Sequence, residues 1–138
     1  MLILVTGGAG YIGSHVCIEL INEGYQLLIL DNLSNSSSNS INFIEEISGQ
    51  SVSFIEGDIR DKSLLQSIFS NNNIDYVMHF AGLRAVGESV NKPLMYYDNN
   101  VIGTVKLLEV MAEYGCKNIV FSSSATVYGD PQYFPINE

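Results

Sequence analysis

The 138 residues suffice for one domain, and a 46% hydrophobic content with a mean hydropathy of +0.17 excludes a disordered chain. Six basic and fifteen acidic residues give a net charge of −9, which repels nucleic-acid phosphates and anionic membrane surfaces. We therefore expect neither nucleic acid nor a membrane as a partner. The sequence has no signal-peptide pattern and no apolar run of membrane length, so we expect a cytoplasmic protein with Cys17 and Cys116 as buried thiols.

Strand and helix patterns alternate along the chain. Short apolar runs predict five strands, at residues 2–6, 26–31, 52–56, 75–81 and 118–122. Apolar residues at helical spacing predict helices at residues 12–22, 41–47 and 62–69, and one long helix within 93–114. Asp61 is placed to cap the third helix, residues 32–40 form a polar loop, and the tail after Tyr128 is loop.

Strands separated by helices predict right-handed βαβ units and a parallel sheet. The expected fold class is α/β, a doubly wound parallel sheet of the Rossmann type with strand order 3-2-1-4-5, truncated after the fifth strand. Ligands of such sheets bind at the carboxyl ends of the strands, where strands one and four diverge. The loops that follow the five strands are therefore the candidate site.

A glycine-rich segment, TGGAGYIGSH (residues 6–15), follows the first strand and opens a helix. Its glycines fit two registers, Gly8-x-Gly10-x-x-Gly13 and Thr6-Gly7-x-x-Gly10-x-x-Gly13. Either register allows a tight turn and a close approach of the main chain to a pyrophosphate, and the helix N-terminus presents free N–H groups. A chain of net charge −9 can therefore hold an anionic group without a lysine.

Asp31 ends the second strand, where a carboxylate can accept both hydrogen bonds of an adenosine ribose diol. The same carboxylate would repel a 2′-phosphate, and residues 32–40 contain no Arg or Lys to bind one. The sequence therefore predicts NAD rather than NADP as the cofactor.

The register that begins at Thr6 resembles extended short-chain dehydrogenase/reductases, and longer stretches are similar to the UDP-glucose 4-epimerase family. These stretches are ILDNLSNS (29–36), HFAGLRAVGES (79–89), KPLMYYDNNVIGT (92–104) and FSSSATVYGD (121–130). With the glycine segment, the resemblance covers nearly the whole chain.

The resemblance implies roles for individual residues, from the phosphates through the adenosine to the nicotinamide. The implied cofactor-binding residues are Gly7, Gly10, Tyr11, Ile12, Gly13, Asp31, Asn32, Leu33, Ser34, Asn35, Ser36, Asp58, Ile59, Phe80, Ala81, Gly82, Leu83, Arg84, Asn99 and Ser122. Arg84 departs from the lysine that is usual in the family, which exchanges a point donor for a planar fork. Ser124 corresponds to the catalytic hydroxyl that hydrogen-bonds the reacting sugar oxygen, and is thus also the implied substrate-binding residue.

Some of these residues also allow a purely structural interpretation. Asp58 can cap a helix, Asn99 can be a surface amide, and Ser124 can cap a turn. His79 and the tyrosines at 96 and 97 are more readily explained by packing than by catalysis.

The resemblance implies interconversion of UDP-galactose and UDP-glucose, through a 4-keto sugar and enzyme-bound NADH, by a homodimer. In the family a tyrosine of a Tyr-x-x-x-Lys pair is the base, and none of the eight tyrosines here has a lysine four residues later. We therefore expect residues 1–138 to be an incomplete NAD-binding domain, without the Tyr–Lys helix and the C-terminal substrate domain, and inactive alone. We also expect self-association, because Val101, Val105, Leu108 and Met111 would be exposed without that helix.

Other functions remain open from the sequence. A nucleotide-sugar 4,6-dehydratase needs an acid/base carboxylate beside the hydroxyl after strand five, and the segment SSSATVYG has none. A nucleotide-sugar decarboxylase or reductase of the same superfamily is a further alternative. A non-catalytic NAD-binding module or sensor would explain the absence of a Tyr-x-x-x-Lys pair.

Overall fold

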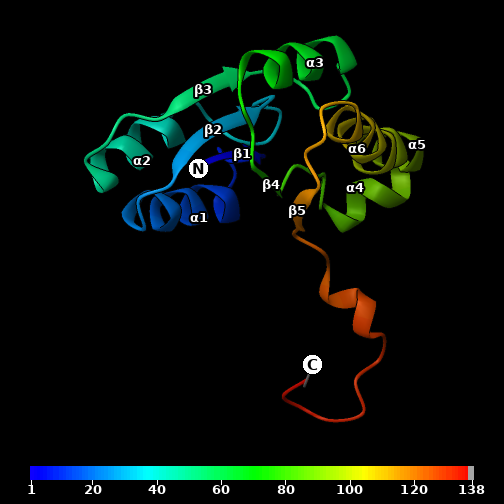
Figure 1. The fold of residues 1–138 in the computed structure, drawn as a ribbon. Helices are drawn as coiled ribbons and strands as arrows, with labels where there is room; N and C mark the ends of the chain where they lie inside the picture. Colours follow the sequence, from blue (N-terminus) through cyan, green and yellow to red (C-terminus); the bar gives the residue numbers. More distant parts are fainter. Residues whose placement is uncertain (137–138) are drawn as a thin grey trace.

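The computed structural model describes residues 1–136 as a parallel five-stranded sheet covered by helices on both faces (Figure 1). The strand order β3-β2-β1-β4-β5 confirms the predicted topology. The strands are β1 (Leu2–Thr6), β2 (Gln26–Asp31), β3 (Ser53–Glu56), β4 (Tyr76–His79) and β5 (Asn118–Phe121). The principal helices are α1 (Tyr11–Asn22), α2 (Asn39–Ser48), α3 (Lys62–Asn71) and α6 (Gly103–Glu113).

Strands β1 to β4 alternate their side chains between two apolar cores, whereas the edge strand β5 contributes only Ile119, to the first. On β1, Leu4 packs with Leu107 of α6 in one core, whereas Val5 packs with Cys17 of α1 in the other. The first core lies between the sheet and helices α3 and α6, and the second lies under α1 and α2. Burial on both faces explains why these strands have apolar runs rather than alternating patterns. Both cysteines are free and buried, as expected.

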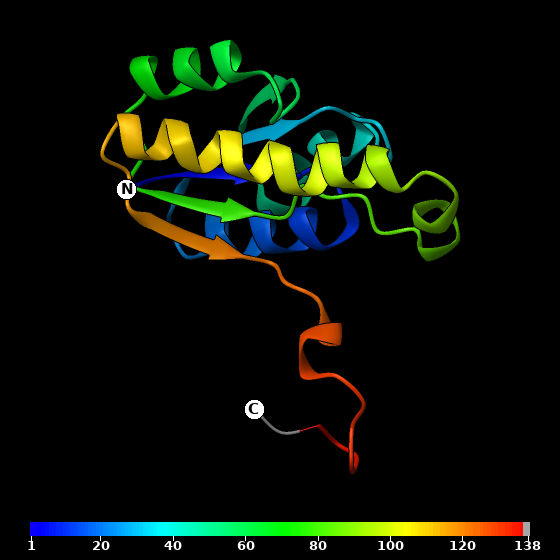
Figure 2. The same cartoon turned by 90° about the vertical axis from the view of Figure 1, so that its right-hand side faces the viewer.

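The long helix expected within residues 93–114 is continuous in space but not uniform in type (Figure 2). It begins as α5 (Pro93–Tyr96), widens into a π-helical segment, η1 (Tyr97–Ile102), and continues as α6. A π turn holds one residue more than an α turn, and such segments are frequent at functional sites. The structure also contains a helix absent from the predicted elements, α4 (Val86–Asn91).

Asp61 caps α3 as predicted, since its side chain accepts a hydrogen bond from the Leu64 N–H at 3.0 Å. Asp58 does not cap this helix. Its carboxylate instead closes a short turn by accepting from the Arg60 N–H.

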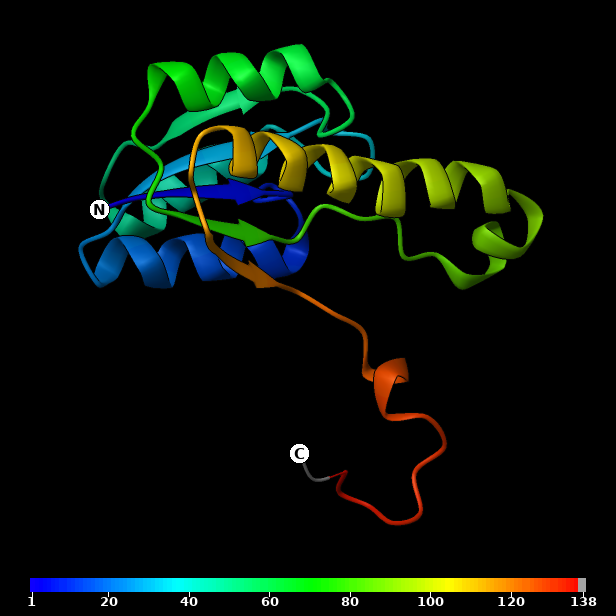
Figure 3. The same cartoon turned by 45° about the vertical axis from the view of Figure 1, so that its right-hand side comes forward.

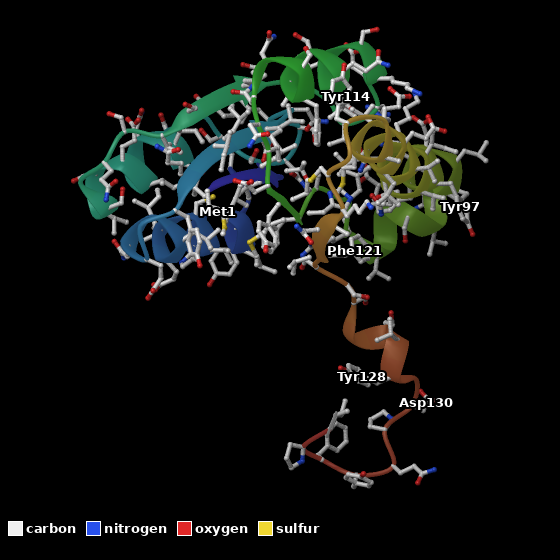
Figure 4. All side chains as sticks on the ribbon, viewed as in Figure 1. Met1, Tyr97, Tyr114, Phe121, Tyr128 and Asp130 are labelled. Atoms are coloured by element: carbon white, nitrogen blue, oxygen red, sulfur yellow. The ribbon has the colours of Figure 1, made fainter. Side chains whose placement is uncertain are left out.

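The outer side of the long helix exposes Val101, Val105 and Leu108, as expected. The expectation was wrong for Met111, which is only 3% exposed because it faces the sheet in the core with α3. Figure 4 shows Tyr97 projecting from the outer side of the same helical segment.

The chain leaves the sheet after β5 and extends away from the body of the molecule (Figure 3). This stretch contains one short 3-10 helix, η2 (Ala125–Tyr128), which the sequence pattern did not predict. Tyr128, at the end of η2, and Asp130, just after it, lie well away from the sheet (Figure 4). Within residues 1–136, no helix combines the length and the apolar character that crossing a bilayer requires.

Candidate nucleotide-binding site

A cleft of about 350 Å³ lies at the carboxyl ends of β1, β2 and β4, where the topology predicts a ligand. Its lining comes from the loops after β1, β2, β3 and β4 and from the π-helical segment. The lining residues are Gly7, Gly10, Tyr11, Ile12, Gly13, Leu30, Asp31, Asn32, Ser34, Asn35, Gly57, Ile59, Phe80, Ala81, Gly82, Leu83, Arg84 and Asn99.

The glycine loop has no room for side chains at Gly7 and Gly13. Gly7 has a φ of +72°, and a Cβ there would lie 2.5 Å from the backbone nitrogen of Ala81. A Cβ on Gly13 would collide with the Gly7 carbonyl oxygen and lie 2.8 Å from the Gly8 Cα. A Cβ on Gly8 would instead meet the end of the Ile29 side chain. These backbone contacts favour the register Thr6-Gly7-x-x-Gly10-x-x-Gly13.

Helix α1 begins at the cleft without a capping side chain. Its N-cap residue is Gly10, and its first turn contains no acidic residue that would neutralise the positive end of the helix dipole. Tyr11, Ile12 and Gly13 line the cleft at this end. The arrangement suits an anionic ligand, because first-turn N–H groups have no partner within their own helix.

Asp31 joins the glycine loop to the loop after β2. Its Oδ2 accepts from the Ala9 N–H at 3.0 Å, and its Oδ1 accepts from the Leu33 N–H and the Ser36 hydroxyl, each at 2.9 Å. A carboxylate offers about four acceptor positions, so Oδ2 retains one for a ligand. The sequence placed both hydrogen bonds of a ribose diol on this carboxylate, and in the structure Leu33 and Ser36 already occupy Oδ1.

Asp58 supports the cleft from outside rather than lining it. Its carboxylate accepts from Asn32 at 2.9 Å and pairs with the Arg60 guanidinium at 2.7 Å. The Arg60 hydrogen bonds hold the pKa of Asp58 well below its usual range. Arg60 also reaches Asp98 of the π-helical segment at 2.7 Å, so it links the loops after β2 and β3 to the long helix.

Arg84 brings a guanidinium to the opposite side of the cleft. Its Nη2 donates to the Phe80 carbonyl at 3.1 Å, which folds the side chain back over its own loop. Arg84 lines the cleft and is exposed, so its charge is available to an anionic ligand.

A directional hydrogen-bond chain lies beneath this loop. The Thr104 hydroxyl donates to the Asn100 carbonyl at 2.7 Å, so the His79 Nε2, 2.9 Å away, must donate to that hydroxyl. The His79 Nδ1 is then an acceptor, and the Thr6 hydroxyl donates to it at 2.6 Å. Burial, helped by the charge of Arg84, lowers the pKa of His79 to about 4 and keeps it neutral. His79 thus has the structural setting that the sequence favoured.

The structure brings most of the expected site residues together. Five lie outside the lining, namely Leu33, Ser36, Asp58, Ser122 and Ser124. The first three hold the loops through Asp31 and Asn32, and the Ser122 N–H donates to the His79 carbonyl at 3.0 Å. Ser124 caps η2, accepting from the Thr126 N–H at 3.3 Å.

Sequence reasoning missed two lining residues. Leu30 precedes Asp31 and lines the cleft despite its core position, and Gly57 follows β3. Gly57 could have been predicted, since it directly follows a predicted strand at the edge of the sheet where the cleft was expected.

Comparisons with known proteins agree with this geometry. The model of the family described as GDP-mannose 4,6 dehydratase matches residues 4–138. The UDP-glucose 4-epimerase of Bacillus subtilis (strain 168) is 59% identical over 138 residues, which cover 100% of this chain and 41% of that relative.

Two solved structures have nearly the same fold. The UDP-glucose 4-epimerase from Bifidobacterium longum, in complex with NAD+ and UDP, matches with a TM-score of 0.96 and 53% identity over 100% of this chain and 41% of its own. The UDP-glucose 4-epimerase from Stenotrophomonas maltophila, with bound NAD and formylated UDP-arabinopyranose, matches with a TM-score of 0.94 and 46% identity. The match covers 99% of this chain and 40% of that chain. The chain therefore belongs to the family described as GDP-mannose 4,6 dehydratase, and it spans about two fifths of the length of the UDP-glucose 4-epimerases that it matches.

Proposed function

We propose that the cleft binds NAD and that residues 1–138 are the NAD-binding part of a UDP-glucose 4-epimerase. One observation carries the proposal: the uncapped N-terminus of α1 and the Asp31 carboxylate line the same cleft, joined through the Ala9 hydrogen bond. The first suits a pyrophosphate and the second a ribose hydroxyl. NAD contains both a pyrophosphate and a ribose diol, and this motif places a helix N-terminus near the first and an acidic residue near the second.

The residues present fit that cofactor. Gly7, Gly10 and Gly13 line the cleft and have no Cβ that would keep a phosphate from the main chain, and Asp31 retains one acceptor position on Oδ2. Asp31 also disfavours a 2′-phosphate, and residues 32–40 offer no basic side chain to bind it. Arg84 contributes the positive charge on the far side of the cleft.

When bound, NAD supplies the hydride acceptor and donor that exchange of configuration at the sugar C4 requires. The chain's own residues bind and orient the cofactor, and we assign Ser124 to hydrogen-bond the sugar oxygen of a UDP-sugar. Its hydroxyl now lies 2.8 Å from that of Thr126, so it remains able to exchange partners. The segment 122–129 contains no carboxylate residue, which favours an epimerase over a dehydratase.

The exposed outer side of the long helix favours a homodimer as the assembled form, since monomers rarely expose large contiguous apolar patches. A cytoplasmic location is consistent with two buried, free cysteines. Neither nucleic acid nor a membrane is proposed as a partner, given the net charge of −9.

A second candidate is a non-catalytic NAD-binding module. The observation that favours it is the absence of a Tyr-x-x-x-Lys pair from the 138 residues, because the base that deprotonates the sugar is then not among them.

Isothermal titration of the purified chain with NAD, NADP and UDP tests the proposal. We expect binding of NAD, weaker binding of NADP, and no conversion of UDP-galactose by these 138 residues. Equal or tighter binding of NADP would contradict the assignment of Asp31. Measurable epimerisation would show that another residue replaces the tyrosine.

A further inference from the structure

Asn100 makes a two-point contact with the loop after β4, although it does not line the cleft. Its Oδ1 accepts from the Leu83 N–H at 2.8 Å, and its Nδ2 donates to the Leu83 carbonyl at 2.9 Å. Because the main chain of Leu83 offers one donor and one acceptor, only one orientation of the Asn100 amide satisfies both. A Cβ on Gly82 would lie 3.6 Å from the same Oδ1, so the loop passes close to this side chain.

The orientation of Asn100 in turn determines that of Asn99. The Asn99 Nδ2 donates to the Asn100 Oδ1 at 2.9 Å, and the reverse orientation would place two amide oxygens together. Asn99 is buried and lines the cleft. Within residues 1–136 the structure gives its Oδ1 no hydrogen-bond partner, so Asn99 has an acceptor free for the cleft, while one of its two N–H groups is held by Asn100.

The main chain of Asn100 is held from a second direction. Its carbonyl accepts from the Thr104 hydroxyl, which is linked through His79 to Thr6 at the end of β1. Asn99 and Asn100 both lie in the π-helical segment Tyr97–Ile102, where successive residues turn through a smaller angle than in an α-helix. The wider turn helps two consecutive amides to face the same loop.

We propose that Asn100 is a positioning residue, which fixes the loop after β4 and turns the carbonyl oxygen of Asn99 toward the cofactor. The inference rests on the proposed binding of NAD. The group that meets the Asn99 Oδ1 must be a hydrogen-bond donor, and NAD offers ribose hydroxyls and a carboxamide NH₂. A ligand that presented only acceptors there would leave the Asn99 Oδ1 unpaired.

The test is the pH dependence of NAD affinity in an Asn100→Asp variant. An ionised carboxylate has the shape of the amide but cannot donate to the Leu83 carbonyl, whereas a protonated carboxyl can. We expect the dissociation constant for NAD to rise about tenfold near pH 8 and to approach the wild-type value only as the pH falls toward 4, near the ordinary pKa of an aspartate carboxyl, where the introduced group takes up its proton. The titratable and charged groups that face this segment are His79, which is linked to the Asn100 carbonyl through Thr104, Arg84 on the loop after β4, and the Arg60–Asp98 pair. The wild-type profile over the same pH range accounts for their effects on binding.

Two further variants complete the experiment. Asn73→Asp adds the same charge at an exposed position before β4, at the opposite edge of the sheet, and should leave NAD affinity unchanged at every pH. Asn99→Leu removes the acceptor and leaves the Leu83 contacts in place, so it should weaken NAD binding about tenfold without a pH dependence.

The outcomes separate this inference from the proposed function. If the unmodified chain does not bind NAD, both are overturned. If it binds NAD while Asn100→Asp binds equally well near pH 8, or binds more weakly by a factor that does not change with pH, only the positioning role is overturned. Should circular dichroism show that Asn100→Asp is unfolded, Asn99→Leu decides, and unchanged affinity in that variant overturns the inference.

Discussion

The carboxylate of Asp31 accepts a hydrogen bond from the backbone N–H of Ala9 at 3.0 Å, which connects the end of β2 to the middle of the glycine loop. Asp31 is 7% exposed, and two further donors converge on its other oxygen. The residue assigned to the ribose is therefore also the residue that shapes the phosphate loop. If the proposed function holds, cofactor selectivity and loop geometry are coupled through this one side chain.

Replacing Asp31 should impair both properties. In Asp31→Asn one oxygen becomes an NH₂ group, which cannot accept from the donors that now surround both oxygens. We expect NAD to bind at least about tenfold more weakly, and thermal unfolding to occur at a lower temperature, because a buried donor loses its acceptor. Calorimetric titration and a melting curve measure the two effects. An unchanged melting temperature would show that the Ala9 contact is unimportant for stability.

The glycine loop can be tested with a pair of matched substitutions. Gly13→Ala places a methyl group against the main chain of Gly7 and Gly8, and we expect a loss of roughly 2 kcal/mol or more in unfolding free energy. Gly87→Ala in α4 meets nothing within 4 Å and should stabilise the protein by up to ~1 kcal/mol, since alanine favours helix. Urea denaturation of both variants measures the difference. Equal stabilities would mean that the loop yields to the methyl group.

His79 makes stability depend on pH. Its pKa is about 4 in the folded protein, against an ordinary value of 6.5, so between these values the unfolded chain binds a proton that the folded chain does not. The contribution of His79 to the free energy of unfolding is therefore fully present above about pH 6.5. It is lost as the pH falls toward 4, and the total loss is on the order of 3 kcal/mol.

The measurement is urea denaturation between pH 7 and pH 5 for two histidine variants. His79→Gln should flatten this part of the stability profile, because its amide does not titrate there. His15→Gln, which removes the exposed histidine, should retain the wild-type slope. A wild-type slope in His79→Gln would assign the effect to other groups.

The exposed side of the long helix should cause self-association. Val105 and Leu108 are 45% and 43% exposed, and we expect concentration-dependent sedimentation of the purified chain. Val105→Glu should shift the chain toward monomer, because it introduces a charge into an apolar contact. Ile47→Glu, at an exposed apolar position of α2, is the control and should leave association unchanged. A monomeric wild type at high concentration would argue against a homodimer through this face.

Much of the architecture could be predicted from local patterns. Leu2–Thr6 and Gln26–Asp31 are bounded in the structure as the apolar runs suggested, because buried parallel strands need apolar side chains on both faces. The strand order followed from the handedness of βαβ units, and the cleft followed from the strand order. Most of the residues in the loops that line the cleft could therefore be predicted from the sequence.

The sequence by itself determined the class of fold, the edge of the sheet that carries the cleft, and most of the residues that line it. Only the tertiary structure decided between the two glycine registers, because Gly7 is constrained by Ala81 in the loop after β4. Tertiary contacts likewise decided the tautomer of His79, the orientation of the Asn99 amide and the burial of Met111. Local periodicity records which face of an element is apolar. It carries no signal for a single π turn or for hydrogen bonds between residues far apart in the chain, and these set the geometry of the cleft.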